Sequence, residues 1–190
     1  RREFQLKRLR PDIRITGIRG NIDTRLRKME EQKLDGILLA AAGLHRLGLR
    51  ERISQYLEPE DMIPAPAQGT LALEIRKEDA ALRQMLDALS DAETEQEAGA
   101  ERRFLKMMGG DCHLPVGACC EKTETGSFRM RVLYGNETGE RLAAACVEGE
   151  DPEELAEEAV AAVGRELAGR VYLVGAGPGD PGLITVRGRE

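Results

Sequence analysis

Arginine is the side chain with binding chemistry that this sequence concentrates most, and it gathers in the first 28 residues. Residues 1–28 carry ten basic side chains, eight of them arginine, against three acidic ones, although the whole chain has a formal charge of −6. A guanidinium presents a planar fork of N–H donors that binds a carboxylate or a phosphate through two hydrogen bonds. The pattern predicts either a solvated charged face or a binding site for an anionic partner.

Nucleic acid is the usual partner of a basic segment, but two features of the sequence argue against it. The chain is acidic as a whole, and residues 5–55 contain no Phe, Trp or Tyr that could stack on single-stranded bases. A small polycarboxylate or polyphosphate therefore remains open as the ligand. An anion- or nucleic-acid-binding module that uses the basic segment remains the alternative.

Cysteine is the second candidate for chemistry, with four residues: Cys112, Cys119, Cys120 and Cys146. This density is far below that of a disulfide scaffold, and the adjacent pair does not have the spacing of a CxxC metal site. Two histidines are too few for a His-rich metal site, so we expect no metal. Reduced thiols, no apolar signal segment and no run of about 18 apolar residues predict a cytoplasmic protein without a membrane partner.

The first half of the sequence alternates between strand and helix patterns. Residues 13–16 and 35–41 are predicted strands. One predicted helix is capped by Asp23 or Thr24 and runs to about residue 32, and a second helical stretch covers 43–57. This order predicts an α/β domain with a parallel sheet. The Pro-, Ala- and Gly-rich cluster at 64–69 marks a domain crossing, and a predicted strand at residues 70–75 follows it.

Residues 91–168 predict a small α+β domain with an antiparallel sheet. A capping box at Ser90–Glu93 opens a helix, residues 128–134 and 142–147 alternate as two strands of a hairpin, and Asp151 caps a second helix.

The last segment, residues 169–190, has a different pattern. A buried-strand pattern at 171–174 precedes a glycine-rich turn, which lets the backbone approach a nucleotide-like ligand. One strand and one loop cannot fold alone, so we expect the segment to be the truncated start of another domain.

Short motifs then occur in the order and at the spacing of one enzyme family. They are Arg1-Arg2, Arg10-Pro11-Asp12, Arg19-Gly20-Asn21, Thr24-Arg25-Leu26, Asp35–Ala40, Gly43-Leu44, Arg46–Leu49, Pro64-Ala65, Gln68-Gly69, Ala100-Glu101-Arg102, and Gly110 with Cys112, Pro115 and Gly117. On these residues the chain up to about residue 168 resembles hydroxymethylbilane synthase, also called porphobilinogen deaminase. Residues 169–190 resemble the first strand and loop of uroporphyrinogen-III methyltransferases, which bind S-adenosylmethionine.

The resemblance implies a domain organisation. Residues 1–64 would form part of a periplasmic-binding-protein-like α/β domain, and residues 65–90 would cross back to an N-terminal domain that these residues do not include. Residues 91–168 would be the C-terminal α+β domain that carries the cofactor cysteine. Residues 169–190 would begin a fused methyltransferase.

The resemblance also implies an activity. The family condenses four porphobilinogen units into hydroxymethylbilane, with loss of ammonia, on a dipyrromethane primer held by a thioether to one cysteine. The matching residue is Cys112, which follows Gly110 and an aspartate where the family often has glycine. We expect the other three cysteines to be small buried apolar residues.

The arginines gain a role because each pyrrole carries an acetate and a propionate. Cofactor binding is implied for Arg1, Arg2, Arg19, Arg25, Gly110 and Cys112, and substrate binding for Arg19, Arg25, Arg46 and Gln68. The family's catalytic aspartate belongs to the N-terminal domain, so no catalytic residue is assigned here, and we expect these residues alone to be inactive. The expected partners are porphobilinogen and oligopyrrole polycarboxylates, bound by a monomer that takes no nucleic acid.

Overall fold

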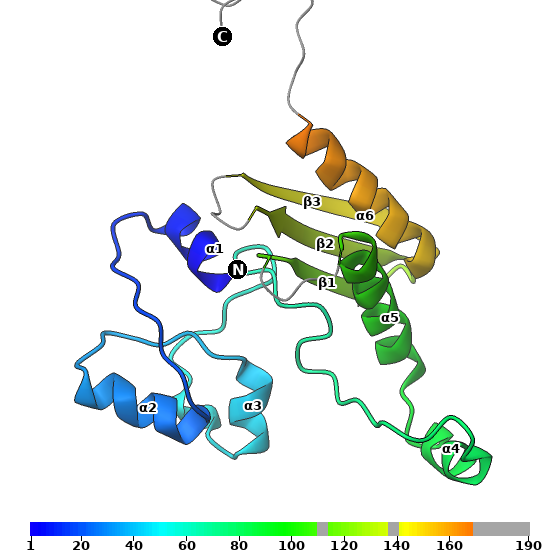
Figure 1. Ribbon diagram of the computed structural model, residues 1–190, viewed down its shortest axis with the longest axis horizontal. Coiled ribbons are helices and arrows are strands. Elements are labelled where there is room, and N and C mark those ends of the chain that lie inside the picture. Colours follow the sequence, from blue (N-terminus) through cyan, green and yellow to red (C-terminus); the bar gives the residue numbers. More distant parts are fainter. Residues whose placement is uncertain (110–113, 137–140, 169–190) are drawn as a thin grey trace, which may run out of the picture.

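The computed structural model describes residues 1–109, 114–136 and 141–168, which form two parts joined by a long crossing segment (Figure 1). The first part holds three helices and a 3-10 turn. In the second part, three strands follow one long helix in the chain and a second long helix follows the strands. In chain order the elements are α1 (Arg2–Leu9), α2 (Ile22–Glu31), α3 (Ala41–Arg46), η1 (Arg50–Arg52), α4 (Ala80–Asp87), α5 (Ala92–Met107), β1 (Gly117–Lys122), β2 (Phe128–Gly135), β3 (Leu142–Gly149) and α6 (Pro152–Leu167).

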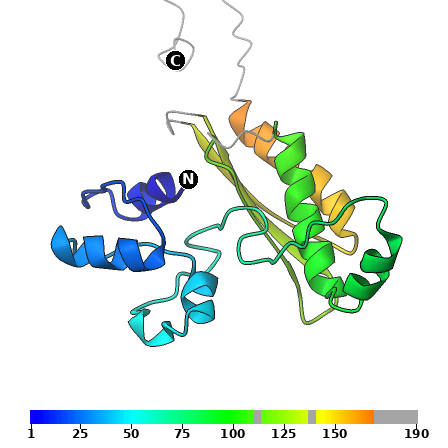
Figure 2. The same ribbon diagram turned by 60° about the horizontal axis from the view of Figure 1, so that its bottom comes forward.

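The second part is an antiparallel sheet in the order β1-β2-β3 with α5 and α6 on one face. In Figure 2 the two helices lie on one side of the sheet and α1–α3 on the other. The core lies between helices and sheet, where Phe104, Met130 and Leu155 are fully buried. The predicted antiparallel sheet is confirmed, and β1 is an additional strand that the sequence pattern did not indicate.

Side-chain caps explain where the helices begin. Asp151 accepts the Glu153 N–H at 2.8 Å ahead of a proline in the first turn of α6, as predicted. The cap of α5 is Asp91, which accepts the Thr94 N–H at 2.8 Å, and so the helix begins one residue later than a cap at Ser90 would place it. The predicted cap of α2 at Asp23 or Thr24 is wrong: Asn21 accepts the Thr24 N–H at 2.9 Å, so the helix begins at Ile22.

The predicted parallel sheet is wrong for the described residues. Residues 13–16, 36–40 and 71–75 form neither a helix nor a strand, and none of them pairs with another strand there. An apolar or alternating pattern favours an extended backbone, but a strand also needs a second segment that offers N–H and C=O groups at the correct spacing. The periplasmic-binding-protein-like architecture predicted for residues 1–64 is therefore not confirmed.

The predicted helix over residues 43–57 is also shorter than expected. α3 ends at Arg46, Gly48 takes a left-handed φ of +70°, and only the 3-10 turn η1 follows. Glycine adopts this conformation readily and so ends the helix early. Among the described residues, no helix combines the length and apolar character that crossing a bilayer requires.

Pro64, just before the crossing segment, and two glutamates of α5 cover the free edge of β1. The outward N–H groups of alternate β1 residues are all satisfied: Ala118 donates to Pro64 O at 3.1 Å, Cys120 to Glu101 Oε1 at 2.7 Å, and Lys122 to Glu97 Oε1 at 2.9 Å. The two glutamates lie one turn apart on α5. The edge is therefore closed by one backbone carbonyl and two carboxylates.

On the other face of the sheet, Arg131 of β2 holds Glu60, a few residues before the crossing segment. Its guanidinium donates to Glu60 and to Glu121, and the residue is only 9% exposed. Gly117 lies so close to this stretch that an added Cβ would be 3.0 Å from Pro64 O. Residues 60–64 thus contact the sheet domain at its edge and on its uncovered face.

Candidate functional site

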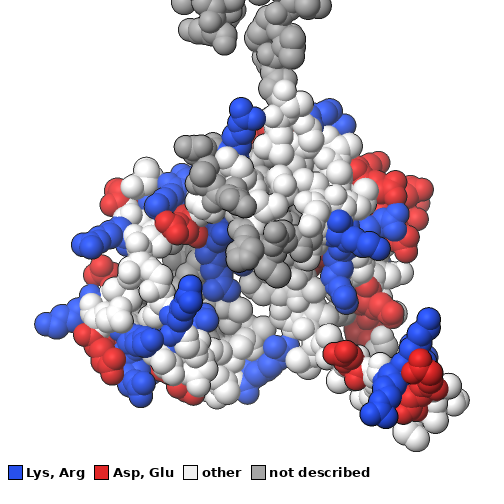
Figure 3. All heavy atoms as spheres, in the orientation of Figure 1, with Lys and Arg blue, Asp and Glu red and all other residues white. Residues whose placement is uncertain are grey.

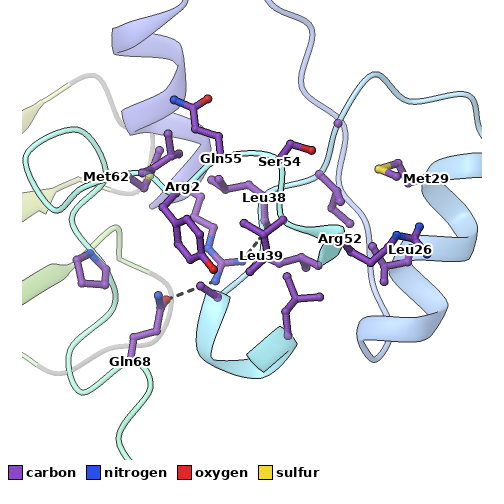
Figure 4. A pocket seen from close by; sticks show the side chains of 18 of the residues that line it. Arg2, Leu26, Met29, Leu38, Leu39, Arg52, Ser54, Gln55, Met62 and Gln68 are labelled. Atoms are coloured by element: carbon purple, nitrogen blue, oxygen red, sulfur yellow. Dashed lines mark hydrogen bonds between the residues drawn. The ribbon is translucent and has the colours of Figure 1, made fainter. Parts of the chain in front are cut away.

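The arginine-bearing pocket is a cavity of about 500 Å³ formed by the α1–α3 part and the start of the crossing segment. We use this name for the cavity whose polar lining includes Arg1, Arg2 and Gln68. Figure 4 shows Arg2, Gln68, Leu38 and Leu39 around the same space. A pocket with apolar walls and a few convergent polar groups is the usual form of a small-molecule site.

The two arginines converge on one amide. Arg1 Nη2 donates to Gln68 Oε1 at 3.2 Å, and Arg2 Nη2 donates to the same oxygen at 3.4 Å. Their other bonds go to backbone carbonyls: Arg1 Nη1 to Ile63 O, and Arg2 Nη1 to Leu38 O at 3.3 Å. Within the described part of the chain neither arginine forms a salt bridge, so their positive charges are not neutralised by a carboxylate in contact.

Burial and mutual repulsion act on both guanidinium groups. Burial, with a smaller contribution from Arg2, lowers the pKa of Arg1 to about 10. Burial, followed by repulsion from Arg25, lowers the pKa of Arg2. Both groups remain charged at neutral pH, and an anion entering the pocket would relieve the repulsion.

The remaining predicted arginines take three different positions, none of them in the lining of the pocket. Arg25 is near enough to repel Arg2, and its Nε donates to Gly20 O at 2.6 Å. Arg46 donates to Gly69 O, next to Gln68 in the chain. Arg19 is exposed. The structure therefore brings together Arg1, Arg2 and Gln68 and leaves Arg19 apart.

The predicted attachment cysteine, Cys112, and Gly110 lie outside the described residues. Of the other cysteines, Cys120 is buried and Cys119 half-buried, as expected for small apolar residues. Burial raises the pKa of both thiols to about 12, which keeps them protonated and unreactive at neutral pH. Cys146 contradicts the expectation of burial: it is exposed on β3, because its side chain lies on the sheet face that the helices do not cover.

Most other basic residues near the chain start are paired or solvated. Lys7 pairs with Glu3, Arg10 with Asp12 and Arg27 with Glu31, all at exposed positions. Figure 3 shows basic side chains spread over the surface around α1–α3, with acidic ones between them. The sequence predicted either a solvated face or an anion site for these basic residues. Most of them form a solvated face, and a small set lines a pocket.

Three further residues contribute to the site without having been predicted. Arg52 and Tyr56 line the pocket; Arg52 pairs with Glu30 at 3.1 Å, and the Tyr56 hydroxyl bonds His45 Nε2 at 2.7 Å. Glu101 is a buried carboxylate that bonds the turn carrying Gln68. The sequence signal for Glu101 is its place one helical turn after Glu97, next to Ala100, on the face of the helix that turns toward the sheet.

Two family models match the chain. The model described as porphobilinogen deaminase, dipyromethane cofactor binding domain, matches residues 1–84, and the model of the porphobilinogen deaminase C-terminal domain matches residues 96–169. The pocket lies within the first match, and the sheet domain fills the second.

Curated relatives give the same result. Porphobilinogen deaminase of Lachnospira eligens is 49% identical over 168 residues, covering 87% of this chain and 57% of the relative. The enzymes of Clostridioides difficile and Geobacillus kaustophilus are 42% and 43% identical, covering 82% and 88% of this chain and 52% and 54% of their own lengths. The chain thus spans about half the length of the curated relatives it matches.

These matches do not support the alternative of an independent anion- or nucleic-acid-binding module. Both matched units belong to one enzyme family, and they follow one another along this chain in non-overlapping ranges. The chain belongs to the porphobilinogen deaminase family of transferases.

Proposed function

We propose that this chain is the part of a hydroxymethylbilane synthase that binds the growing oligopyrrole. The enzyme condenses four porphobilinogen units, with release of ammonia at each addition. The observation that carries the proposal is the arginine-bearing pocket, where Arg1 and Arg2 meet at Gln68 without a neutralising carboxylate in contact among the described residues.

The pocket suits a ligand that carries several carboxylates. Each pyrrole of the chain bears an acetate and a propionate, and a charge-assisted hydrogen bond contributes about 1.5–3 kcal/mol. Arg1 and Arg2 would bind carboxylates of the primer or substrate, while the apolar side chains Leu38 and Leu39 would lie against a pyrrole ring. Arg25, which already repels Arg2, would add to the positive potential at the same side.

A titration with porphobilinogen tests the pocket. Arg1→Gln and Arg2→Gln should each weaken binding by about tenfold or more, because each removes one charge-assisted contact. Arg8→Gln is the matched control, because Arg8 is an exposed arginine on the same helix as Arg2. Equal affinities for all three variants and the unaltered chain would refute the assignment.

We also propose that dipyrromethane is attached through Cys112, with Arg1, Arg2, Arg19, Arg25 and Gly110 around it. The primer supplies the carbon nucleophile for chain growth, and this part of the protein supplies the sulfur and the arginines. Two observations support the fit: two charged guanidinium groups in contact only with neutral partners, and a cavity of about 500 Å³ beside them. Arg46 and Gln68 complete the set proposed for substrate.

The attachment is tested by intact mass. Protein isolated from cells that make porphobilinogen should carry the added mass of a dipyrromethane, and Cys112→Ser should remove it. Cys146→Ser is the control, because Cys146 is an exposed cysteine of the same chain. Persistence of the added mass in Cys112→Ser, or its absence from the unaltered protein, would refute attachment at this sulfur.

Exposed apolar side chains support a docking role for the crossing segment. Leu71, Leu73, Met85 and Leu89 are each more than 60% exposed, and α4 stands apart from both parts in Figure 1. We propose that residues 65–90 pack against the portion of the longer relatives that this chain does not span. That portion would also supply the catalytic aspartate, so the 190 residues alone should not convert porphobilinogen.

We propose that residues 169–190 belong to a different unit, the start of a methyltransferase that binds S-adenosylmethionine. The match to the deaminase C-terminal domain ends at residue 169, and α6 ends at Leu167. Limited proteolysis should therefore cleave after α6 and leave the sheet domain intact. We further propose a monomer in the cytoplasm.

A further inference from the structure

Glu101 is a buried carboxylate that the proposed function does not use. It lies on α5, is only 7% exposed, and bonds two different parts of the chain. Its Oε1 accepts the Cys120 N–H at the edge of β1 at 2.7 Å, and its Oε2 accepts the Ala67 N–H of the crossing segment. Through these two bonds, one side chain of α5 ties β1 to the turn that contains Ala67.

The turn that Glu101 holds is strained. Ala67 has a left-handed φ of +56°, which costs a residue with a Cβ on the order of 1 kcal/mol. Such a conformation persists only where surrounding contacts enforce it. The Ala67 N–H bond to Glu101 is one such contact, and the next residue is Gln68.

We propose that Glu101 is the positioning residue of the arginine-bearing pocket: it fixes the turn at residues 64–69 against β1 and so holds the Gln68 amide where Arg1 and Arg2 meet it. The effect on ligand binding rests on the proposed function, whereas the effect on the turn does not. On its other side the turn is linked to α1, because the backbone of Ile63 bonds the Gln5 side chain at 2.8 Å and 3.0 Å.

The surroundings of Glu101 bring its titration into a pH range where it can be followed in the folded protein. Burial raises the pKa of Glu101 to about 7, against the two backbone N–H bonds, which lower it. The titratable groups that face it are Glu97 on α5 and the thiols of Cys119 and Cys120 on β1, and both thiols stay protonated because their pKa is about 12. The turn at 64–69 carries no titratable side chain.

A pH titration of amide resonances in the unaltered chain tests the bridge without any mutation. The Ala67 and Cys120 amides should shift with one common midpoint, and the Gln68 side-chain amide should follow the same curve. The Lys122 amide is the internal control, because it bonds Glu97 instead. Different midpoints for Ala67 and Cys120, or a Gln68 amide that does not move, would overturn the proposal.

Porphobilinogen binding tests the consequence for the pocket. Glu101→Gln should weaken binding about fivefold to tenfold, because the amide group keeps one acceptor and turns a donor toward the second N–H. Glu97→Gln, which removes a carboxylate charge one turn away on α5 and touches no bond to the turn, should leave the affinity unchanged. In a Gln68→Ala background Glu101→Gln should have no further effect, since coupled residues are not additive.

The outcomes separate the two proposals. A loss of affinity from Glu101→Gln that is fully retained in the Gln68→Ala background would show a purely structural role and overturn the positioning. If the unaltered chain fails to bind porphobilinogen, the proposed function fails for this chain, and the resonance titration still decides whether Glu101 positions the turn.

Discussion

The sheet domain of residues 91–168 and the arginine-bearing part of residues 1–64 are built in different ways. The sheet domain has a continuous apolar core with many fully buried side chains. In the first 64 residues the buried apolar side chains are Leu44, Met62 and Ile63, and much of the organisation comes from hydrogen bonds to backbone carbonyls. One part is held by packing and the other by polar contacts around a cavity.

The difference follows from how the strands find partners. β2 and β3 are neighbours in the chain and pair through a short connection, so the hairpin is complete within a few residues. A parallel strand needs a partner that arrives after a long crossover, and residues 13–16 and 36–40 find none among the described residues. A part that lacks such partners forms no sheet of its own and depends on other contacts.

The largest effect expected from this contrast is loss of the sheet-domain core. Phe104→Ala should lower the free energy of unfolding of that domain by about 3–5 kcal/mol, because the ring is 0% exposed and leaves a cavity. Leu73→Ala, in the extended crossing segment at 64% exposure, should cost less than about 0.5 kcal/mol. Urea unfolding followed by circular dichroism measures both. Similar losses for the two variants would abolish the contrast.

Glu101 joins the two parts and should give the next largest effect, through pH. Its folded-state pKa of about 7 lies above the ordinary 4.5, so the folded chain binds more protons between these values than the unfolded chain. As pH rises from 4.5 to 7, the ionisation of this group should therefore lower the free energy of unfolding by about 3 kcal/mol. Above pH 7 its effect no longer changes with pH.

Glu101→Gln should flatten that part of the pH profile of stability, since an amide does not titrate. Urea unfolding at intervals between pH 4.5 and 8 measures the slope. A profile with an unchanged slope would assign the pH dependence to other groups.

Arg131 should give a smaller effect that is confined to the connection between the parts. Arg131→Met removes the bonds to Glu60 and Glu121 and should cost about 1.5 kcal/mol, because both carboxylates can be rehydrated. Hydrogen exchange at the Ala118 amide, which bonds Pro64 O, should accelerate. Arg129→Met, at the more exposed pair with Glu148, is the control and should leave that amide unchanged.

The smallest effects concern helix caps. Asp151→Ala removes the cap of α6 and should cost about 1 kcal/mol of sheet-domain stability. Asp79 caps α4 by accepting the Leu82 N–H at 3.0 Å, and Asp79→Ala removes this bond. Because α4 stands apart from the sheet domain, the global unfolding temperature should not change. Thermal unfolding of both variants compares them directly, and a shift for Asp79→Ala would place α4 within the cooperative unit.

The sequence predicts best those elements whose signals are local. The cap at Asp151, the proline after it and the apolar stripe of α6 lie within one helix, and the alternation of β2 and β3 lies within one hairpin. β1 was missed because its sequence, Gly-Ala-Cys-Cys-Glu-Lys, has neither β-branched nor aromatic residues. It is a strand because β2 pairs with it.

The candidate site was predictable in part. The motifs located Arg1, Arg2 and Gln68. The fold brings the two adjacent arginines to Gln68, although more than 60 residues separate it from them in the chain. Arg19 shared the same motif signal yet lies exposed, since a motif does not state which way a side chain points. Glu101 lies in one of the motifs, but the motif does not reveal its role, because burial of a carboxylate depends on which segment crosses above it.

The closed edge of β1 has a consequence for self-association. An uncovered strand edge presents a row of free N–H and C=O groups that can template pairing with another chain. Here one carbonyl and two carboxylates occupy that row, so detachment of the crossing segment would open part of a ready surface for strand addition between molecules. Variants that loosen this connection would then be lost to aggregation or proteolysis before their binding chemistry was impaired.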